Sequence, residues 1–317
     1  MTTDATLAGS RVRRDLVHRA NDQEILVSPP RQAADGGYVS TTVTTDLSPY
    51  YRDHPISHWL DILLLVEACR QAALSAAHEF EGLSHNIAFF FNSIDVELID
   101  PAALASLTAE ATVRTDFEQL RLRSDGTPKQ IEYAQTVTDA TGRPLARTTM
   151  AVQGVPKPRY PELRAYQRDG TPAPTTAALR SDAARAGLST PRSVARTLAT
   201  NVAIGEAHAE GDLLSALLAP DLSNASLFDH DYDHFPAMVL IEAGRQLAIA
   251  GTYQPATQAV TAVRATFEHF AELDRETSVV ARRGSHWTDV ECVQDGLAVT
   301  RLSFAVGPVA PGDGDVS

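Results

Sequence analysis

The sequence predicts an α+β protein made of two tandem copies of one unit, each a long central helix wrapped by a curved antiparallel sheet. The first observation is an internal repeat, because residues 63–74 read LLLVEACRQAAL and residues 238–249 read MVLIEAGRQLAI. The second is that both segments are apolar on nearly all sides, which indicates helices surrounded by protein. The third is the run of strand-like segments after each helix, which predicts an antiparallel meander.

The composition favours two globular domains in a reducing compartment. The chain has 317 residues with 44% hydrophobic content, enough for two cores of ordinary size. A net charge of −13 without a Lys/Arg cluster argues against nucleic acid. Two cysteines are too few for a disulfide framework or a thiolate zinc site, and no run reaches the ~18 apolar residues of a membrane span. We expect a soluble cytoplasmic protein without a membrane partner, either a monomeric double unit or a homodimer.

A change in composition separates the two copies. Residues 155–191 are rich in Pro, Arg, Ala and Thr and include PKPRYP and TPAPTT, which is typical of a linker. We therefore expect the first repeat at 11–154, the linker at 155–191, the second repeat at 192–307 and a disordered tail at 308–317.

The first copy is expected to run from a strand into the long helix and then into a meander. Residues 37–45 are β-branched and aromatic, which predicts a strand, and the apolar run predicts a helix at about 61–80. Turn chemistry at Asp125-Gly126 and Thr141-Gly142 separates several of the strands that follow. These strands are expected at 86–99, 106–115, 117–124, 130–138 and 145–152.

The second copy repeats this order after a lead-in segment at 199–218. Pro236 stands in the first turn of a helix at about 236–252, where its missing N–H costs nothing. Strands are then expected at 260–270, 277–283, 286–293 and 297–306. A curved antiparallel sheet around one long apolar helix is the hot-dog architecture, so we predict a tandem double hot-dog. An α+β domain with other strand pairing has the same element order and remains an alternative.

One polar stripe crosses the predicted helix of each copy. Glu67, Arg70 and Gln71 stand at i, i+3 and i+4 and so project from one face. The second copy carries the same residue types at a constant offset of 175, as Glu242, Arg245 and Gln246. A charge in such a place is costly unless it is paired, and such groups often perform acid/base chemistry. A structural Glu–Arg pair is the alternative.

The loop at 229–236, DHDYDHFP, is the densest polar cluster of the chain. It leads into a helix N-terminus, where unpaired backbone N–H groups are suited to hold a thioester oxygen or a phosphate. His234 is the candidate acid/base, tuned by Asp233 or Glu242, and His230 is a candidate substrate ligand. A metal site and a solvated N-cap are alternatives. Because no third ligand group stands out at helical spacing, we predict no metal.

The first copy has a less acidic counterpart of this loop, in which His54 is followed by His58. In two-fold hot-dog assemblies the active sites lie where the helix of one unit meets the loop of the other. On that basis Glu67 would work with the second loop, and Glu242 with the two histidines. Cys69 is a less favoured nucleophile, since it lies about 100° round the helix from the carboxylate. Gly-rich nucleotide motifs are lacking, so no cofactor is expected.

These residues resemble a known family. The strings DHFPAMVLIEAGRQ at 233–246, DILLLVEACRQA at 61–72 and DLVHRANDQEILV at 15–27 are similar to the A-factor biosynthesis hot-dog family, the γ-butyrolactone autoregulator synthases of actinobacteria. The resemblance covers about residues 17–304. It implies transfer of a β-ketoacyl group from an acyl carrier protein, or a CoA thioester, to a hydroxyl of dihydroxyacetone phosphate. The resulting ester later closes to a butenolide.

The resemblance also implies roles for particular residues. The matching motif positions are Glu67, Glu242, Arg70, Arg245, Asp233 and His234. A carboxylate or imidazole would act as the base, and the arginines would bind the triose phosphate. The further predicted substrate ligands are Gln71, Gln246, His230, His54 and His58.

Two departures keep other classes open. Ala237 stands where the family loop usually has glycine, which matters if the backbone there needs a positive φ. The HFP…EA segment also resembles hot-dog hydroxyacyl dehydratases, so a dehydratase or thioesterase is one alternative and a non-catalytic acyl-binding protein is another. An acidic carrier protein would need a local basic dock, for which the candidates are Arg192 with Arg196, or Arg282 with Arg283.

Overall fold

A computed structural model describes residues 10–43, 46–56, 59–102, 111–180 and 187–309. The chain forms two compact units: unit 1 is Met1–Ser48 with Leu64–Tyr166, and unit 2 is Pro49–Leu63 with Gln167–Ser317. The segment before the first long helix therefore packs with the second copy. The predicted limits of the repeats and linker stay predictions, and most of the predicted disordered tail lies outside the described residues.

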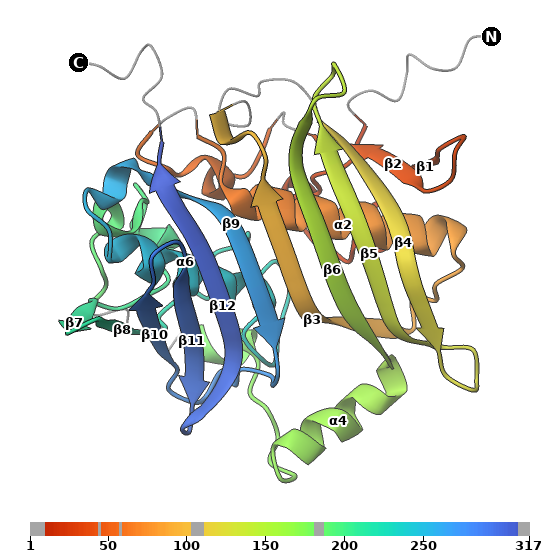
Figure 1. Cartoon of the computed structure of the whole chain (residues 1–317). Helices are drawn as coiled ribbons and strands as arrows, with labels where there is room; N and C mark the ends of the chain where they lie inside the picture. The colour runs from red at the N-terminus through yellow and green to blue at the C-terminus, as the bar shows by residue number, and fades with distance from the viewer. Residues whose placement is uncertain (1–9, 44–45, 57–58, 103–110, 181–186, 310–317) are drawn as a thin grey trace. The chain divides into compact units, whose positions relative to one another are not determined.

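Unit 1 is an antiparallel sheet with one long helix against its face (Figure 1). In pairing order its described strands are β1 (Arg31–Gln32), β2 (Tyr38–Thr41), β4 (Thr112–Leu122), β5 (Pro128–Thr138), β6 (Pro144–Pro156) and β3 (Ile87–Leu98). The long helix is α2 (Ile62–Phe80). Shorter elements are α1 (Arg14–Val17), η1 (Asp22–Glu24), η3 (Lys157–Arg159) and α4 (Tyr160–Gln167), which ends at the start of unit 2.

Unit 2 repeats the same topology. In pairing order its described strands are β7 (His208–Glu210), β8 (Leu213–Leu217), β10 (Ser278–Arg283), β11 (Thr288–Gln294), β12 (Leu297–Pro308) and β9 (Gln258–Phe267). The other elements are η2 (Pro49–Arg52), α5 (Thr176–Leu179), η4 (Pro191–Val194), η5 (Ala199–Asn201), α6 (Ala237–Ala250) and η6 (Pro255–Thr257). Each unit is thus a hairpin, a helix and four strands, of which the last three form a meander and the first pairs with the last of them. The pairing order is the same in both units, which confirms the tandem double hot-dog and corrects the expected four-strand meander.

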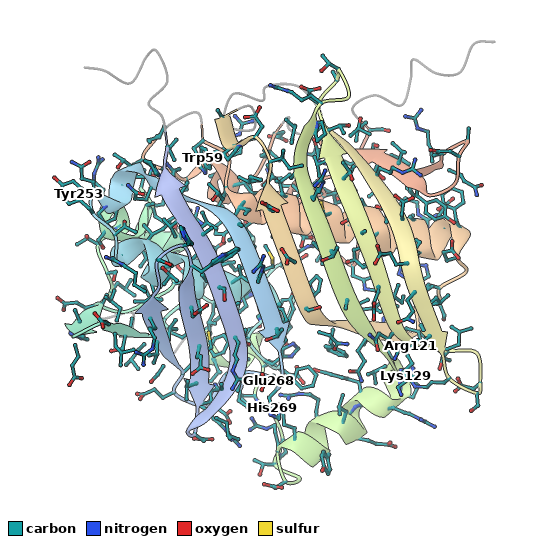
Figure 2. The ribbon with its side chains drawn as sticks, in the orientation of Figure 1. Trp59, Arg121, Lys129, Tyr253, Glu268 and His269 are labelled. Atoms are coloured by element: carbon teal, nitrogen blue, oxygen red, sulfur yellow. The ribbon has the colours of Figure 1, made fainter. Side chains whose placement is uncertain are left out.

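The two long helices are buried because their sequences leave almost no polar face. Every residue from Met238 to Ile249 of α6 is buried, and the sheet of unit 2 packs along the helix. The helix ends at Ala250, and Tyr253 beyond it is 84% exposed (Figure 2). Ala237 begins the helix and has no positive φ, so the missing glycine causes no strain there. None of the described helices is long and apolar enough to span a membrane.

Three details differ from the sequence prediction. The two strands expected at 106–115 and 117–124 are one strand, β4, because a β-bulge between Phe117 and Gln119 absorbs the irregular alternation. Residues 106–110 lie outside the described residues. The hairpin β7–β8 falls in a segment expected only to lead into the second copy, since its two strands are short. The expected linker contains the helices α4 and α5.

A helical glycine gives a sensitive probe of the packing in unit 2. A Cβ on Gly244 of α6 would lie 2.5 Å from Leu302 Cδ1 and 2.9 Å from Phe304 Cε2. Cys69 occupies the matching position in the first copy (69 + 175 = 244). The two helices therefore approach their sheets differently at this point.

We expect Gly244→Ala to destabilise the protein by about 1–3 kcal/mol, because the overpacking outweighs the gain in helix propensity of about 1 kcal/mol. The measurement is the urea unfolding midpoint. Gly251→Ala is the matched control, since its nearest neighbour is the flexible Arg283 side chain. Equal midpoints for the two variants would contradict the packing argument.

Candidate functional site

A buried carboxylate in unit 1 is held by two arginines and a glutamine. Glu67 of α2 has no exposed surface. Arg19 donates from Nε to Oε1 at 2.9 Å, and its Nη2 lies 2.8 Å from Oε2. Arg70 donates to both oxygens at 2.9 and 2.7 Å, and Gln71 donates to Oε1 at 2.6 Å. We call these four residues the Glu67 clamp, in which both carboxylate oxygens are fully engaged.

Unit 2 contains the same arrangement around Glu242, which is also fully buried. Arg196 donates from Nε at 2.9 Å and places Nη2 2.8 Å from the other oxygen. Arg245 donates to both oxygens at 2.8 Å, and Gln246 donates to Oε1. We call these residues the Glu242 clamp. The polar stripe predicted on each helix is therefore a closed ion-pair network in each unit.

In unit 1 the glutamine of the clamp also fixes the backbone of the segment that supplies the first arginine. Gln71 accepts from the N–H of Leu26 at 2.8 Å and donates to the carbonyl of Glu24 at 2.7 Å. That segment includes Arg19, five residues before the bound carbonyl. One side chain thereby satisfies two buried backbone groups as well as the carboxylate.

Unit 2 reproduces these bonds at the same spacing. Gln246 accepts from the N–H of Ala203 at 2.8 Å and donates to the carbonyl of Asn201 at 2.7 Å. Arg196 again stands five residues before the carbonyl (201 − 196 = 24 − 19). The duplication therefore includes the arginine segment, which the sequence analysis missed because its spacing from the helix differs between copies.

The clamps bear directly on the predicted catalytic role of the two glutamates. Burial acts to raise the pKa of Glu67, but Arg19 and Arg70 outweigh it and lower the pKa to about 2. A carboxylate held in this way is a weak proton acceptor at neutral pH. Glu242 has both oxygens bonded to guanidinium groups in the same way. Catalysis by these glutamates stays a prediction, and the geometry favours a positioning role.

The Glu242 clamp has additional members from the segment 49–63. Asp61 Oδ2 lies 2.9 Å from Arg196 Nη2 and 3.8 Å from Arg245 Nε. The ring of Tyr50 lies under the Arg196 guanidinium, with its centroid 4.6 Å from Cζ. Arg196 is only 1% exposed. It therefore cannot belong to a surface dock for a carrier protein, which corrects the first of the two predicted docks.

His54 is a buried structural group of unit 2. Its Nδ1 accepts from the N–H of Ile56 at 3.0 Å, so Nε2 carries the proton and donates to the carbonyl of Gln258 at 3.0 Å. Burial lowers the pKa of His54 to about 4, which keeps the ring neutral. His58, its predicted companion, lies outside the described residues.

The loop before α6 pairs its histidines with adjacent acids. His234 Nδ1 lies 2.7 Å from Asp233 Oδ1, and His230 Nδ1 lies 2.7 Å from Asp229 Oδ1. The third acid, Asp231, accepts from the backbone and side chain of residues 176–177 instead. The predicted Asp233–His234 dyad therefore exists, and its partly exposed imidazole can exchange protons with a ligand.

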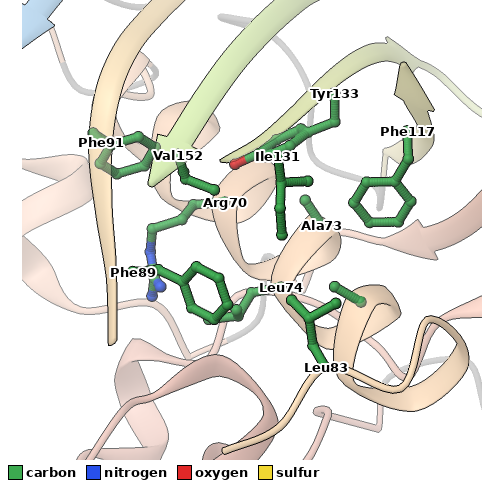
Figure 3. Close-up of a pocket in the computed structure, with 11 residues that line it drawn as sticks. Arg70, Ala73, Leu74, Leu83, Phe89, Phe91, Phe117, Ile131, Tyr133 and Val152 are labelled. Atoms are coloured by element: carbon green, nitrogen blue, oxygen red, sulfur yellow. The ribbon is translucent and has the colours of Figure 1, made fainter. Parts of the chain in front are cut away.

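An apolar pocket, partly open to solvent, lies in unit 1 between α2 and the sheet (Figure 3). Arg70, whose side chain is 19% exposed, is its one charged lining residue. The other lining residues are Ala73, Leu74, Ala77, Leu83, Phe89, Phe91, Phe117, Ile131, Tyr133 and Val152. The pocket thus combines a hydrophobic wall with one oriented cation.

Cys69 is not suited to nucleophilic chemistry. Its side chain is fully buried, and burial raises the pKa of the thiol to about 12. The thiolate form that attacks thioesters is therefore almost absent at neutral pH.

Two copies of a helix-in-sheet unit, one with an apolar pocket that opens beside an arginine, define a double hot-dog protein. The sequence profile of the A-factor biosynthesis hotdog domain matches residues 2–156 and 177–302. The chain belongs to the A-factor biosynthesis hotdog family, as its motifs predicted.

Named relatives cover most of the chain. It is 30% identical over 270 residues to the 2-oxo-3-(phosphooxy)propyl 3-oxoalkanoate synthase of Streptomyces coelicolor, covering 82% of this chain and 78% of the relative. It is 27% identical to the synthase of the same name from Streptomyces virginiae, covering 84% and 85%. An acyl-ACP thioesterase structure from Bacteroides thetaiotaomicron aligns with a TM-score of 0.48 at 12% identity, covering 85% of this chain and 97% of that one.

We expect Glu67→Gln to destabilise the protein by about 3 kcal/mol at pH 7, since two largely buried arginine side chains lose their anionic partner. The folded pKa of Glu67, about 2, lies below its ordinary value of 4.5. The stabilisation is therefore complete above about pH 4.5 and is lost as the pH falls towards 2. Unfolding curves from pH 7 to 3 should show the difference from the unmodified protein shrinking. Glu79→Gln, at an exposed position on the same helix, is the control, and a pH-independent difference would contradict the assignment.

Proposed function

We propose that this protein is an acyltransferase in the biosynthesis of a γ-butyrolactone-type signalling molecule. It would transfer a 3-oxoacyl group from an acyl carrier protein or CoA thioester to a hydroxyl of dihydroxyacetone phosphate or a similar phosphorylated triose. Family membership and the printed name of both Streptomyces relatives support this reaction. They favour it over the dehydratase, thioesterase and non-catalytic alternatives.

The observation that carries the proposal is the unit 1 pocket with Arg70 in its wall. The apolar walls suit an alkyl chain, whose burial is favourable by about 0.8 kcal/mol per methylene. A guanidinium suits the anionic phosphate or the polarised carbonyl of the same reactants. Because Glu67 binds Arg70 through two bonds, the guanidinium is held in place before substrate arrives, which reduces the cost of ordering it.

The chemistry needs a proton acceptor but no covalent enzyme intermediate. The hydroxyl oxygen attacks the thioester carbon, the C–S bond breaks, and the thiol leaves with a proton. His234 is our candidate for the base, because Asp233 accepts from its Nδ1 and the lone pair is then carried by Nε2. The glutamates and glutamines of the two clamps would orient the arginines rather than transfer protons.

A carrier protein would be the larger partner. Arg121 and Lys129 are exposed on the neighbouring strands β4 and β5 (Figure 2), and Arg121 pairs in register with Gln130. Lys129 stands two residues from Ile131, which lines the pocket. This end of the unit 1 sheet offers positive charge to an acidic carrier close to the pocket. Arg282 and Arg283 are likewise exposed in unit 2 and remain a predicted dock.

The test is mass spectrometry of the protein incubated with a 3-oxoacyl carrier protein or a short thioester surrogate, with and without dihydroxyacetone phosphate. We expect a phosphorylated ester, or the butenolide derived from it, only when the triose is present. Thioester hydrolysis, or loss of water from a hydroxyacyl analogue, at the same rate without the triose would overturn the proposal.

Two variants assign the roles. His234→Ala should lower kcat by about 10²–10⁴-fold, the usual contribution of a general base. Arg70→Lys keeps the positive charge but loses the two parallel N–H donors of the guanidinium group. We therefore expect KM for the triose to rise more than kcat falls. His286→Ala, at an exposed position, is the control. Unchanged kinetics in the His234 variant would remove this residue from the mechanism.

The pocket also predicts a change in chain-length preference. Ala73→Leu places a larger side chain in the pocket wall, so we expect kcat/KM for long acyl thioesters to fall about tenfold relative to short ones, as the loss of one or two methylene contacts would require. Ala248→Leu is the matched control, because it occupies the equivalent buried position in unit 2 (73 + 175 = 248). The same shift in both variants would argue against an acyl site in unit 1.

A further inference from the structure

Three histidines that the proposed reaction does not use meet at the rim of the unit 1 pocket. His18 follows α1, His78 lies in the last turn of α2, and His85 lies in the exposed turn before β3. One ring nitrogen from each lies within 4.8 Å of the other two. Because these residues are as much as 67 positions apart (85 − 18), no sequence spacing revealed the cluster.

The fold itself does not require these imidazoles. His18 has a left-handed backbone with φ 52°, and its counterpart Ala195, the residue before the arginine of the other clamp, has the same φ. The position that matches His78 in the second copy (78 + 175 = 253) is Tyr253, which is 84% exposed. Unit 2 therefore forms the left-handed residue before its clamp arginine without histidine, and its helix α6 ends before the position that matches His78. Among the described residues, the cluster is a feature of unit 1 alone.

The hydrogen bonds orient the nitrogen atoms for ligation. His78 Nδ1 lies 2.8 Å from the carbonyl of Leu83, which can only accept, so Nδ1 carries the proton and Nε2 the lone pair. This Nε2 lies 3.0 Å from His18 Nε2. A backbone carbonyl that fixes the far nitrogen of a histidine is the usual outer-shell arrangement of a metal ligand.

The distances suit a small tetrahedral ion. Three nitrogens at 2.0–2.1 Å from Zn²⁺ stand about 3.3 Å from one another, which lies between the 3.0 Å and the 4.8 Å found here. The His85 ring stacks parallel to His78 at 4.3 Å, so this exposed side chain must turn to bring its lone pair to the same point.

We propose that His18, His78 and His85 form a binding site for one divalent transition-metal ion of the Zn²⁺ class at the rim of the unit 1 pocket. Three histidines leave a fourth position open to water or a ligand. Phe89 and Leu83, which line the pocket, contact the cluster through ring packing and the His78 hydrogen bond. The cluster is thus next to the pocket. The inference rests on this geometry and not on the proposed acyl transfer.

The competing ligand is an anion. Lys157 and Arg70 both act electrostatically on His18, and positive charge weakens the binding of a cation while it strengthens that of a phosphate. The test must therefore separate the two ligands.

The experiment is a calorimetric titration of ZnCl₂ into full-length protein that carries no polyhistidine tag and has been dialysed against chelator. Co²⁺ serves as a second, spectroscopic probe. We expect one ion per chain and the visible absorption bands of four-coordinate Co²⁺. His85→Ala should weaken binding by about 10–100-fold, and His18→Ala with His85→Ala should abolish it. His208→Ala, at an exposed position on β7, is the control.

Folding and anion binding are checked in parallel. His85 is exposed and the residue corresponding to His18 is alanine in unit 2, so both variants are expected to keep the thermal midpoint of the unmodified protein. The proposal is overturned if Zn²⁺ binds the double variant as tightly as the unmodified protein. It is also overturned if inorganic phosphate, and not the metal, loses binding in His85→Ala.

Discussion

The bidentate pairing of a buried glutamate with two arginines is the interaction on which the rest of each unit depends. Taking Glu67 out of water costs several kcal/mol, and only close, well-aligned cationic donors offset that cost. The geometry supplies them from the helix itself and from a segment 48 residues earlier (67 − 19). The ion pair therefore joins the N-terminal segment of the unit to its central helix. Neither could shift by one residue without leaving a charge unpaired in the core.

The glutamine next to each arginine extends this constraint to the backbone. Gln71 binds a carbonyl and an N–H of the segment that carries Arg19, so both the register and the direction of that segment are fixed. The resulting position of Arg70 explains how a polar group can stand in an otherwise apolar pocket wall. Specificity of this kind is a known use of buried polar networks when every member is satisfied. In this protein both units retain the complete network of glutamate, two arginines and glutamine, which indicates that both units need it.

The sequence predicted the features that are encoded locally, and it did not predict contacts between segments that are distant in the chain. The apolar helices and their Glu, Arg and Gln stripes follow from i, i+3, i+4 spacing alone. The turn at Asp125-Gly126, where the glycine has a positive φ, follows from its residue types. The partner arginine was not predicted because Arg19 lies in a short irregular segment with no periodicity. The sequence also did not predict that residues 49–63 belong to the second unit. No local residue pattern indicates which of two hydrophobic cores a segment packs against.

The two units have diverged around the same scaffold, and the divergence changes how far the arginine of each clamp is exposed. In unit 2, Asp61 adds a second carboxylate to the clamp, and the side chain of Arg245 is only 3% exposed. Leu302 and Phe304 pack so closely on Gly244 that a Cβ there would overlap their side chains. In unit 1 the matching Arg70 is 19% exposed and lines a pocket. A duplicated clamp therefore holds one helix against its sheet in unit 2 while, in unit 1, the same residues leave a partly exposed cation in a pocket wall.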